Sequence, residues 1–232
     1  MQKLLILLSV TISPMVLKSQ NFQLHYDMGK DRKYLTSTVE MYKPDKWGST
    51  FFFIDMDYGA GDVKGVSLGY FEFSRGLKFW KSPFEVHIEY NGGFLQSKSP
   101  ADGLYHAYQI NDAWLFGGNY TWNTKDFSKV FTLEAMYKNI RGKTDMSFQI
   151  TGVWTIQLLK NKFTLCGFAD FWKEDNLAFN GIKTYYVFLA EPQFWYNFTD
   201  HFSIGSEVEV SSNFGGHDGL MVNPTIAGKW KF

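Results

Sequence analysis

The last stretch of the chain is Leu220-Met-Val-Asn-Pro-Thr-Ile-Ala-Gly-Lys-Trp-Lys-Phe232, and it alternates between two kinds of side chain. One set of alternate positions is mostly apolar and ends on Trp230 and Phe232, while the other is mostly polar and includes Lys229 and Lys231. Because successive residues of a β-strand point to opposite faces, this pattern predicts a strand with one apolar face and one polar face.

An alternating strand that ends on an aromatic residue is typical of outer-membrane β-barrels, whose last strand closes the cylinder against the first. The ending resembles the terminal aromatic signal read by the barrel-insertion machinery, so we expect Phe232 to contact that machinery. The alternative is the closing strand of an ordinary soluble β-protein.

The composition favours the membrane alternative. The chain has 232 residues, of which 19% are aromatic, with 23 Phe, 13 Tyr and 8 Trp. Such usage suits a lipid-facing band with aromatic girdles. Beyond the N-terminus no window holds the roughly 20 apolar residues of a spanning helix, and a barrel needs apolar residues only at alternate positions. The lone Cys166 excludes an internal disulfide, and no basic run indicates nucleic acid.

Residues 1–19 have the pattern of a secretory signal peptide that is removed from the mature protein. Lys3 supplies the positive start, and an apolar core follows over residues 4–10. The apolar run is too short to span a membrane as a helix. We therefore expect export, with residues 20–232 forming a single domain in the outer membrane of a Gram-negative-type bacterium.

The rest of the chain divides into alternating segments separated by turn residues. Twelve can be distinguished, at residues 21–28, 34–42, 49–58, 66–79, 84–94, 104–122, 130–138, 146–159, 163–172, 182–198, 202–211 and 220–232. The expected fold is therefore all-β, a 12-stranded antiparallel transmembrane barrel. Gly117-Gly118 predicts a bulge or phase change, and Pro192 predicts a bulge or a missing ladder bond. We expect longer loops at residues 96–103 and 173–181.

If the apolar faces contact lipid, the polar faces line a lumen. The expected lining residues are Phe51, Phe53, Asp55, Asp57, Tyr70, Glu72, Arg75, Glu85, His87, Glu89, Phe168, Asp170, Trp172, Glu191, Glu207 and Glu209. Glu40 and Glu134 are further candidate acids, and Lys138 and Lys229 further candidate cations. Aromatic rings can stack on a ring-bearing solute while carboxylates bind its hydroxyls and ring nitrogens, which predicts passive passage of a small polar solute. Alternatively, the carboxylates pair with cations and fill the bore.

Three stretches near the N-terminus resemble the nucleoside-specific outer-membrane channel family of the Tsx type. They are Lys33-Tyr-Leu-Thr-Ser-Thr-Val-Glu-Met-Tyr-Lys43, Phe51-Phe-Phe-Ile-Asp-Met-Asp-Tyr58 and Tyr70-Phe-Glu-Phe-Ser-Arg75. The resemblance implies a monomeric 12-stranded barrel that passes nucleosides, with Phe51, Phe53, Asp55 and Asp57 as lining residues. An uncharacterised outer-membrane family related to this one is the alternative home.

Other chemistry is less compatible with the pattern. Glu85-x-His87-x-Glu89 puts three metal-capable groups on one strand face, but metal binding would need a ligand from a neighbouring strand. Paired acids also occur in glycosidases, yet they are common in any water-filled barrel. His201-Phe-Ser203 has the spacing of an outer-membrane phospholipase nucleophile, but Ser203 shares the lumen-facing side of Glu207. The sequence therefore predicts no enzyme, catalytic residue, metal ligand or cofactor. A structural barrel without an open pore is the third class.

Overall fold

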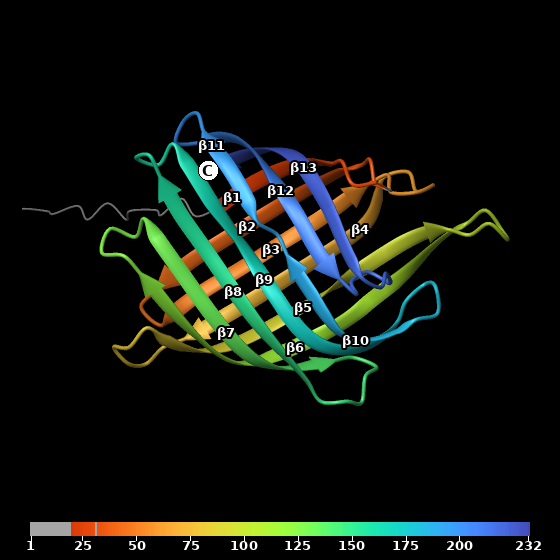
Figure 1. The fold of residues 1–232 in the computed structure, drawn as a ribbon, viewed down its shortest axis with the longest axis horizontal. Helices are drawn as coiled ribbons and strands as arrows, with labels where there is room; N and C mark the ends of the chain where they lie inside the picture. Colours follow the sequence, from red (N-terminus) through yellow and green to blue (C-terminus); the bar gives the residue numbers. More distant parts are fainter. Residues whose placement is uncertain (1–19, 31) are drawn as a thin grey trace, which may run out of the picture.

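The computed structural model describes residues 20–232 with the exception of residue 31 and of the side chain of residue 111. The predicted signal peptide lies outside the described residues. The described chain is built from antiparallel strands (Figure 1). Their bounds are β1 (Gln20–Asp27), β2 (Leu35–Asp45), β3 (Gly48–Tyr58), β4 (Val66–Leu77), β5 (Phe84–Lys98), β6 (Tyr105–Asn123), β7 (Lys129–Ile140), β8 (Ser147–Leu158), β9 (Phe163–Leu177), β10 (Lys183–Ala190), β11 (Gln193–Asn197), β12 (Phe202–Ser212) and β13 (Leu220–Lys231).

The strands close into one cylinder. Apart from β10 and β11, which do not pair with each other, consecutive strands pair with each other, and β13 pairs with both β12 and β1, so the sheet has no free edge. β10 and β11 both lie between β9 and β12 and fill one position of the ring. The result is a closed 12-stranded antiparallel barrel, which confirms the predicted fold class. A closed sheet satisfies its own backbone hydrogen bonds, as a barrel in lipid must.

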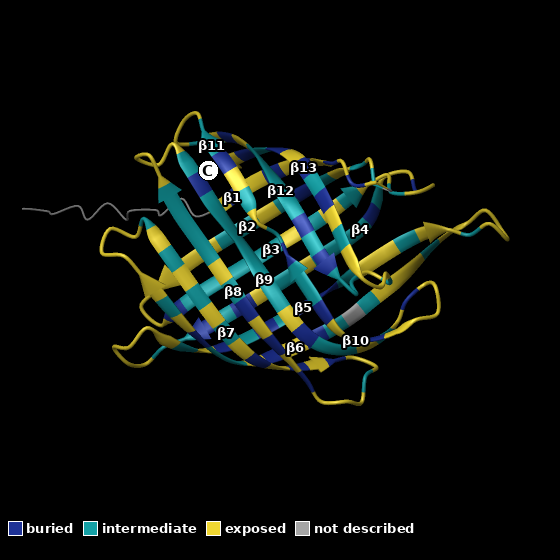
Figure 2. Ribbon diagram, viewed as in Figure 1, coloured by how far each residue is buried: buried dark blue, intermediate teal, exposed yellow. Residues whose placement is uncertain are grey.

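Burial alternates along the strands as the sequence pattern predicts. In β1 every second residue is buried, from Asn21 to Asp27, and the intervening Phe22, Leu24 and Tyr26 are exposed. Figure 2 shows the same exposed and buried bands along other strands. Large apolar side chains cover the outer surface of every strand position, whereas the buried inner side chains include many amides, hydroxyls and charged groups. The barrel therefore has an apolar exterior and a polar interior.

Two irregularities were predicted, and the structure places one of them elsewhere. The chain breaks between β10 and β11 at Pro192, whose carbonyl accepts a hydrogen bond from the backbone N–H of Val208, so this prediction is confirmed. The bulge predicted at Gly117-Gly118 is wrong, because both glycines pair in register with β5 and β7. A Cβ on Gly117 would lie 2.0 Å from the carbonyl oxygen of Ala135, so the glycine permits close strand approach.

The bulge in this hairpin lies nearer its tip. Asn91 pairs with Ala113 and Gly93 with Ile110, so one residue of β5 faces two residues of β6. Beyond the bulge the β5–β6 hairpin extends past the rim of the barrel (Figure 1). The loops predicted at residues 96–103 and 173–181 begin later in the structure than in the prediction. β5 continues to Lys98, and β9 continues to Leu177. Among the described residues there is no helix long and apolar enough to cross a membrane.

Candidate functional site

The candidate site is the barrel interior, where two walls face each other. In the ring of twelve positions, β3 and β9 are six positions apart, as are β4 and the β10–β11 position. They therefore lie on opposite sides of the cylinder. We call the inner face of β3 and β4 the first wall and the inner face of β9 to β12 the second wall.

The first wall combines aromatic rings with carboxylates. The ring of Phe53 lies 6.0 Å from that of Phe51 and 5.9 Å from that of Tyr70, centroid to centroid. Asp55 accepts a 2.5 Å hydrogen bond from the hydroxyl of Thr38, and the Tyr70 hydroxyl donates to Glu72 Oε1 at 2.7 Å. These bonds fix the carboxylates against the wall and leave further oxygen lone pairs for a solute.

The second wall has the same composition. Asp170 accepts a 2.5 Å hydrogen bond from the Thr151 hydroxyl, and Glu207 accepts a 2.6 Å bond from the Gln193 amide. Phe168 lies on the same face of β9 as Asp170. Its carbonyl oxygen accepts a hydrogen bond from the backbone N–H of Glu191 at the strand break. The break at Pro192 thus places Glu191 on the inner face, opposite the first wall.

Carboxylates of the two walls are close enough to interact across the bore. Glu72 interacts electrostatically with Asp170, and Glu191 interacts with Asp55 and with Glu207. All five side chains remain partly accessible to water. The two walls therefore border a partly accessible, acidic strip inside the barrel.

The remaining inner surface is more tightly packed. Lys138 donates to Gln149 Oε1 at 2.7 Å and lies 4.2 Å above the Trp172 ring. Lys229 lies 3.9 Å above the ring of Trp195. Neither lysine forms an ion pair with a carboxylate in the described part of the chain. Their contacts with rings and amides leave five wall acids of the described chain without a direct cationic partner, namely Asp55, Glu72, Asp170, Glu191 and Glu207, so an excess of negative charge persists.

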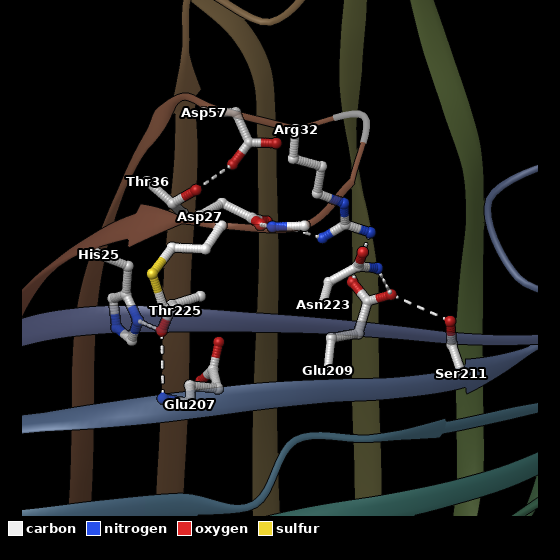
Figure 3. A network of polar contacts seen from close by, with 12 residues as sticks. His25, Asp27, Arg32, Thr36, Asp57, Glu207, Glu209, Ser211, Asn223 and Thr225 are labelled. Atoms are coloured by element: carbon white, nitrogen blue, oxygen red, sulfur yellow. Dashed lines mark hydrogen bonds and ion pairs between the residues drawn. The ribbon is translucent and has the colours of Figure 1, made fainter.

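A loop side chain reaches into one mouth of the barrel (Figure 3). Arg32, between β1 and β2, lies 3.1 Å from Asp27 and 2.7 Å from Glu209. Glu209 also accepts hydrogen bonds from Asn223 and Ser211. Burial lowers the pKa of the Arg32 guanidinium, but the Glu209 carboxylate outweighs this and raises the pKa above its ordinary value. The charged guanidinium therefore ties the loop to the inner faces of β1 and β12.

Replacing Arg32 by Ala is expected to lower the free energy of unfolding by about 1–3 kcal/mol, because two largely buried carboxylates lose their partner. Urea unfolding in lipid measures this. The matched control is Arg75→Ala, whose partner Asp45 is exposed, so its loss should cost much less than the loss of Arg32. Equal costs for the two variants would contradict the anchoring role of Arg32.

Fifteen of the sixteen expected lining residues lie on the inner face, and one does not. Arg75 shares the outer face of Phe71 and Phe73, where its guanidinium binds Asp45 at 2.7 Å and the Thr50 hydroxyl at 2.8 Å. The lumen assignment of Arg75 is thus wrong, because an odd position of β4 cannot share a face with Glu72. The inner set forms three groups, namely the first wall, the second wall and a cluster at His87. The second wall includes Trp172, which lies beside Lys138, and Glu209, which pairs with Arg32.

The inner residues missed by the sequence reasoning include Trp195, Arg32 and Asn119. Trp195 is almost fully buried and donates a 2.8 Å hydrogen bond to Gln193 Oε1, and the alternation of β11 could have revealed it. Arg32 belongs to a loop, where no periodicity indicates direction. His201 and Ser203, the spacing typical of a phospholipase, lie apart: the His201 ring stacks on Trp230, which is exposed on the outer face, whereas Ser203 is buried and donates to Asn197.

Known proteins share this fold. The solved NanC porin matches with a TM-score of 0.54 and 13% identity, over 92% of this chain and 99% of that one. The KdgM porin matches with a TM-score of 0.49 and 10% identity, over 92% of this chain and 98% of that one. The Acinetobacter baumannii outer membrane protein Omp33 matches with a TM-score of 0.45 and 14% identity, over 92% of this chain and 96% of that one. No curated protein matches the sequence. Residues 19–232 match the family described as "Domain of unknown function (DUF5020)", and the chain belongs to that family.

Proposed function

We propose that the protein is an outer-membrane channel for small polar solutes. The observation that carries the proposal is the pair of facing walls, whose carboxylates and aromatic rings remain accessible inside a closed barrel. The apolar exterior supports insertion into lipid, and the fold shared with the NanC porin supports placement in the outer membrane. Export through a signal peptide at residues 1–19 and recognition of Phe232 by the insertion machinery are part of this proposal.

Nucleosides are the solutes that we propose first. A nucleoside offers a flat base, which can stack on Phe53 or Tyr70, and ribose hydroxyls, which can donate to Asp55 or Asp170. The excess of carboxylates disfavours anions in a narrow bore, so a neutral nucleoside should pass more readily than a nucleotide of similar shape. Passage is passive and follows the solute gradient.

Uptake by liposomes that contain the purified protein tests the proposal. A nucleoside, a sugar and an amino acid of similar size are compared, with the nucleoside monophosphate as the anionic analogue. We expect the nucleoside to enter faster than the other solutes and a second nucleoside to compete. If no solute enters although the barrel is folded, the channel proposal fails and a barrel without an open pore takes its place.

A further inference from the structure

A buried cluster on the inner faces of β5 and β7 lies beside the first wall, where Glu89 pairs with Ser74 of β4. His87 Nε2 lies 2.9 Å from Glu89 Oε2, and His87 Nδ1 lies 3.8 Å from Glu134 Oε1. One ligand atom from each of these three residues can be chosen so that all lie within 4.8 Å of one another. The neighbouring strand thus supplies the additional ligand that the pattern on β5 alone lacked.

Asn119 on β6 is the fourth residue of the cluster, and its side-chain hydrogen bonding indicates that the cluster binds a ligand. It pairs with Glu85 on β5 and with Glu134 on β7, and its amide nitrogen lies 3.3 Å from His87 Nδ1. Asn119 is 7% exposed, and its buried Oδ1 has no hydrogen-bond partner. A buried acceptor without a partner is costly, and a cation among these residues would satisfy it.

We propose that His87, Glu89, Asn119 and Glu134 bind a divalent transition-metal ion of the Zn²⁺ type. One imidazole nitrogen with carboxylate and amide oxygens is a donor set that Zn²⁺ accepts, and bonds of about 2.0–2.2 Å require donors about 3–3.5 Å apart. Rotation of the two glutamate side chains and a flip of the Asn119 amide, which exchanges its nitrogen beside His87 for Oδ1, bring the four donors together. When both carboxylates are ionised they carry two negative charges, which a divalent ion neutralises. Glu85 is engaged elsewhere, since its Oε2 accepts a 2.6 Å hydrogen bond from Ser49.

Zn²⁺ binding to the purified full chain tests the site directly. The folded protein in lipid nanodiscs is stripped with a chelator, and Zn²⁺ is titrated by calorimetry with metal analysis of the bound fraction. We expect one Zn²⁺ for each chain. His87→Gln and Glu134→Gln should each weaken binding by more than the roughly 10–100-fold that loss of an outer-shell partner costs.

His106→Gln is the matched control. His106 also sits beside a carboxylate, with Nε2 3.0 Å from Asp102, but this pair is exposed on the protruding hairpin and lacks further donors. It should bind Zn²⁺ like the unaltered protein. Ca²⁺, which prefers oxygen ligands alone, should bind far more weakly than Zn²⁺. The proposal is overturned if the unaltered protein binds no Zn²⁺, or if both cluster variants bind it as the control does.

If a cluster variant fails to fold, the Asn119→Asp variant still tests the proposed site. The substitution keeps the size of the side chain and replaces the neutral amide oxygen by a charged one, so Zn²⁺ should bind more tightly. Equal or weaker binding by the folded Asn119→Asp protein would overturn the four-donor site. These measurements involve no permeation, so their outcome is independent of the proposed channel.

Discussion

Replacing Ile54 by Arg should lower the free energy of unfolding in a bilayer by about 2–4 kcal/mol, the range for a charge on the lipid face at mid-membrane. Ile54 is exposed on the outer face of β3, seventh of its eleven residues. It pairs with Val39 and Phe71, which are also exposed and lie near the middle of their strands. A charge there would have to be desolvated in hydrocarbon, whereas in water the same substitution on an exposed side chain would cost little.

Leu158→Arg is the matched control for depth. Leu158 is an exposed apolar residue on the outer face, but it is the last residue of β8. Near the interface the cost should be about 0–1 kcal/mol. Urea unfolding of both variants in the same lipid gives the comparison. Equal costs at the two depths would contradict the assignment of the apolar exterior to a membrane.

Neutralising four carboxylates of the two walls should greatly reduce the cation preference of the channel. The variant combines Asp55→Asn, Glu72→Gln, Asp170→Asn and Glu191→Gln. A potential of −1 kT in the bore changes the ratio of cations to anions by about sevenfold, and walls of one sign produce potentials of this order or larger. We therefore expect the cation-to-anion permeability ratio, obtained from the reversal potential in a salt gradient, to fall by about sevenfold or more.

The control removes as many charges from the loops. Asp62, Asp102, Asp126 and Asp218 lie outside the strands, and their replacement by Asn should leave the ratio nearly unchanged. Asn and Gln can still accept the hydrogen bonds that Thr38 and Thr151 donate, so the wall variant is expected to fold. If it folds and keeps its full cation preference, these carboxylates do not control permeation.

Much of the barrel could be predicted from the sequence because the signal repeats at every second residue. The alternation that separates Phe52 from Phe53 also separates lipid from lumen, so fold class and lining residues follow from one pattern. Arg75 was assigned wrongly because its charge suggested the lumen, whereas its place in the alternation of β4 puts it on the outer face. Pro192 was predictable because proline lacks the N–H that a ladder needs.

Other features depend on distances that a pattern cannot supply. The bulge between Asn91 and Gly93 depends on how β5 and β6 align, and the two adjacent glycines at 117 and 118 indicated the wrong place. Arg32 reaches Glu209 across 177 positions of sequence because the barrel closes β1 against β13 beside β12. Likewise, Glu134 and Asn119 meet His87 only once three strands are in register.

If the bore conducts and its acidic walls select the passing ion, the unaltered protein should form a cation-selective pore. The reversal potential of the unaltered protein in a planar bilayer with a potassium chloride gradient tests this most directly. We expect a stable conductance whose reversal potential has the sign of a cation-selective pore. A folded, inserted barrel that gives no conductance, or one that selects chloride, would contradict it.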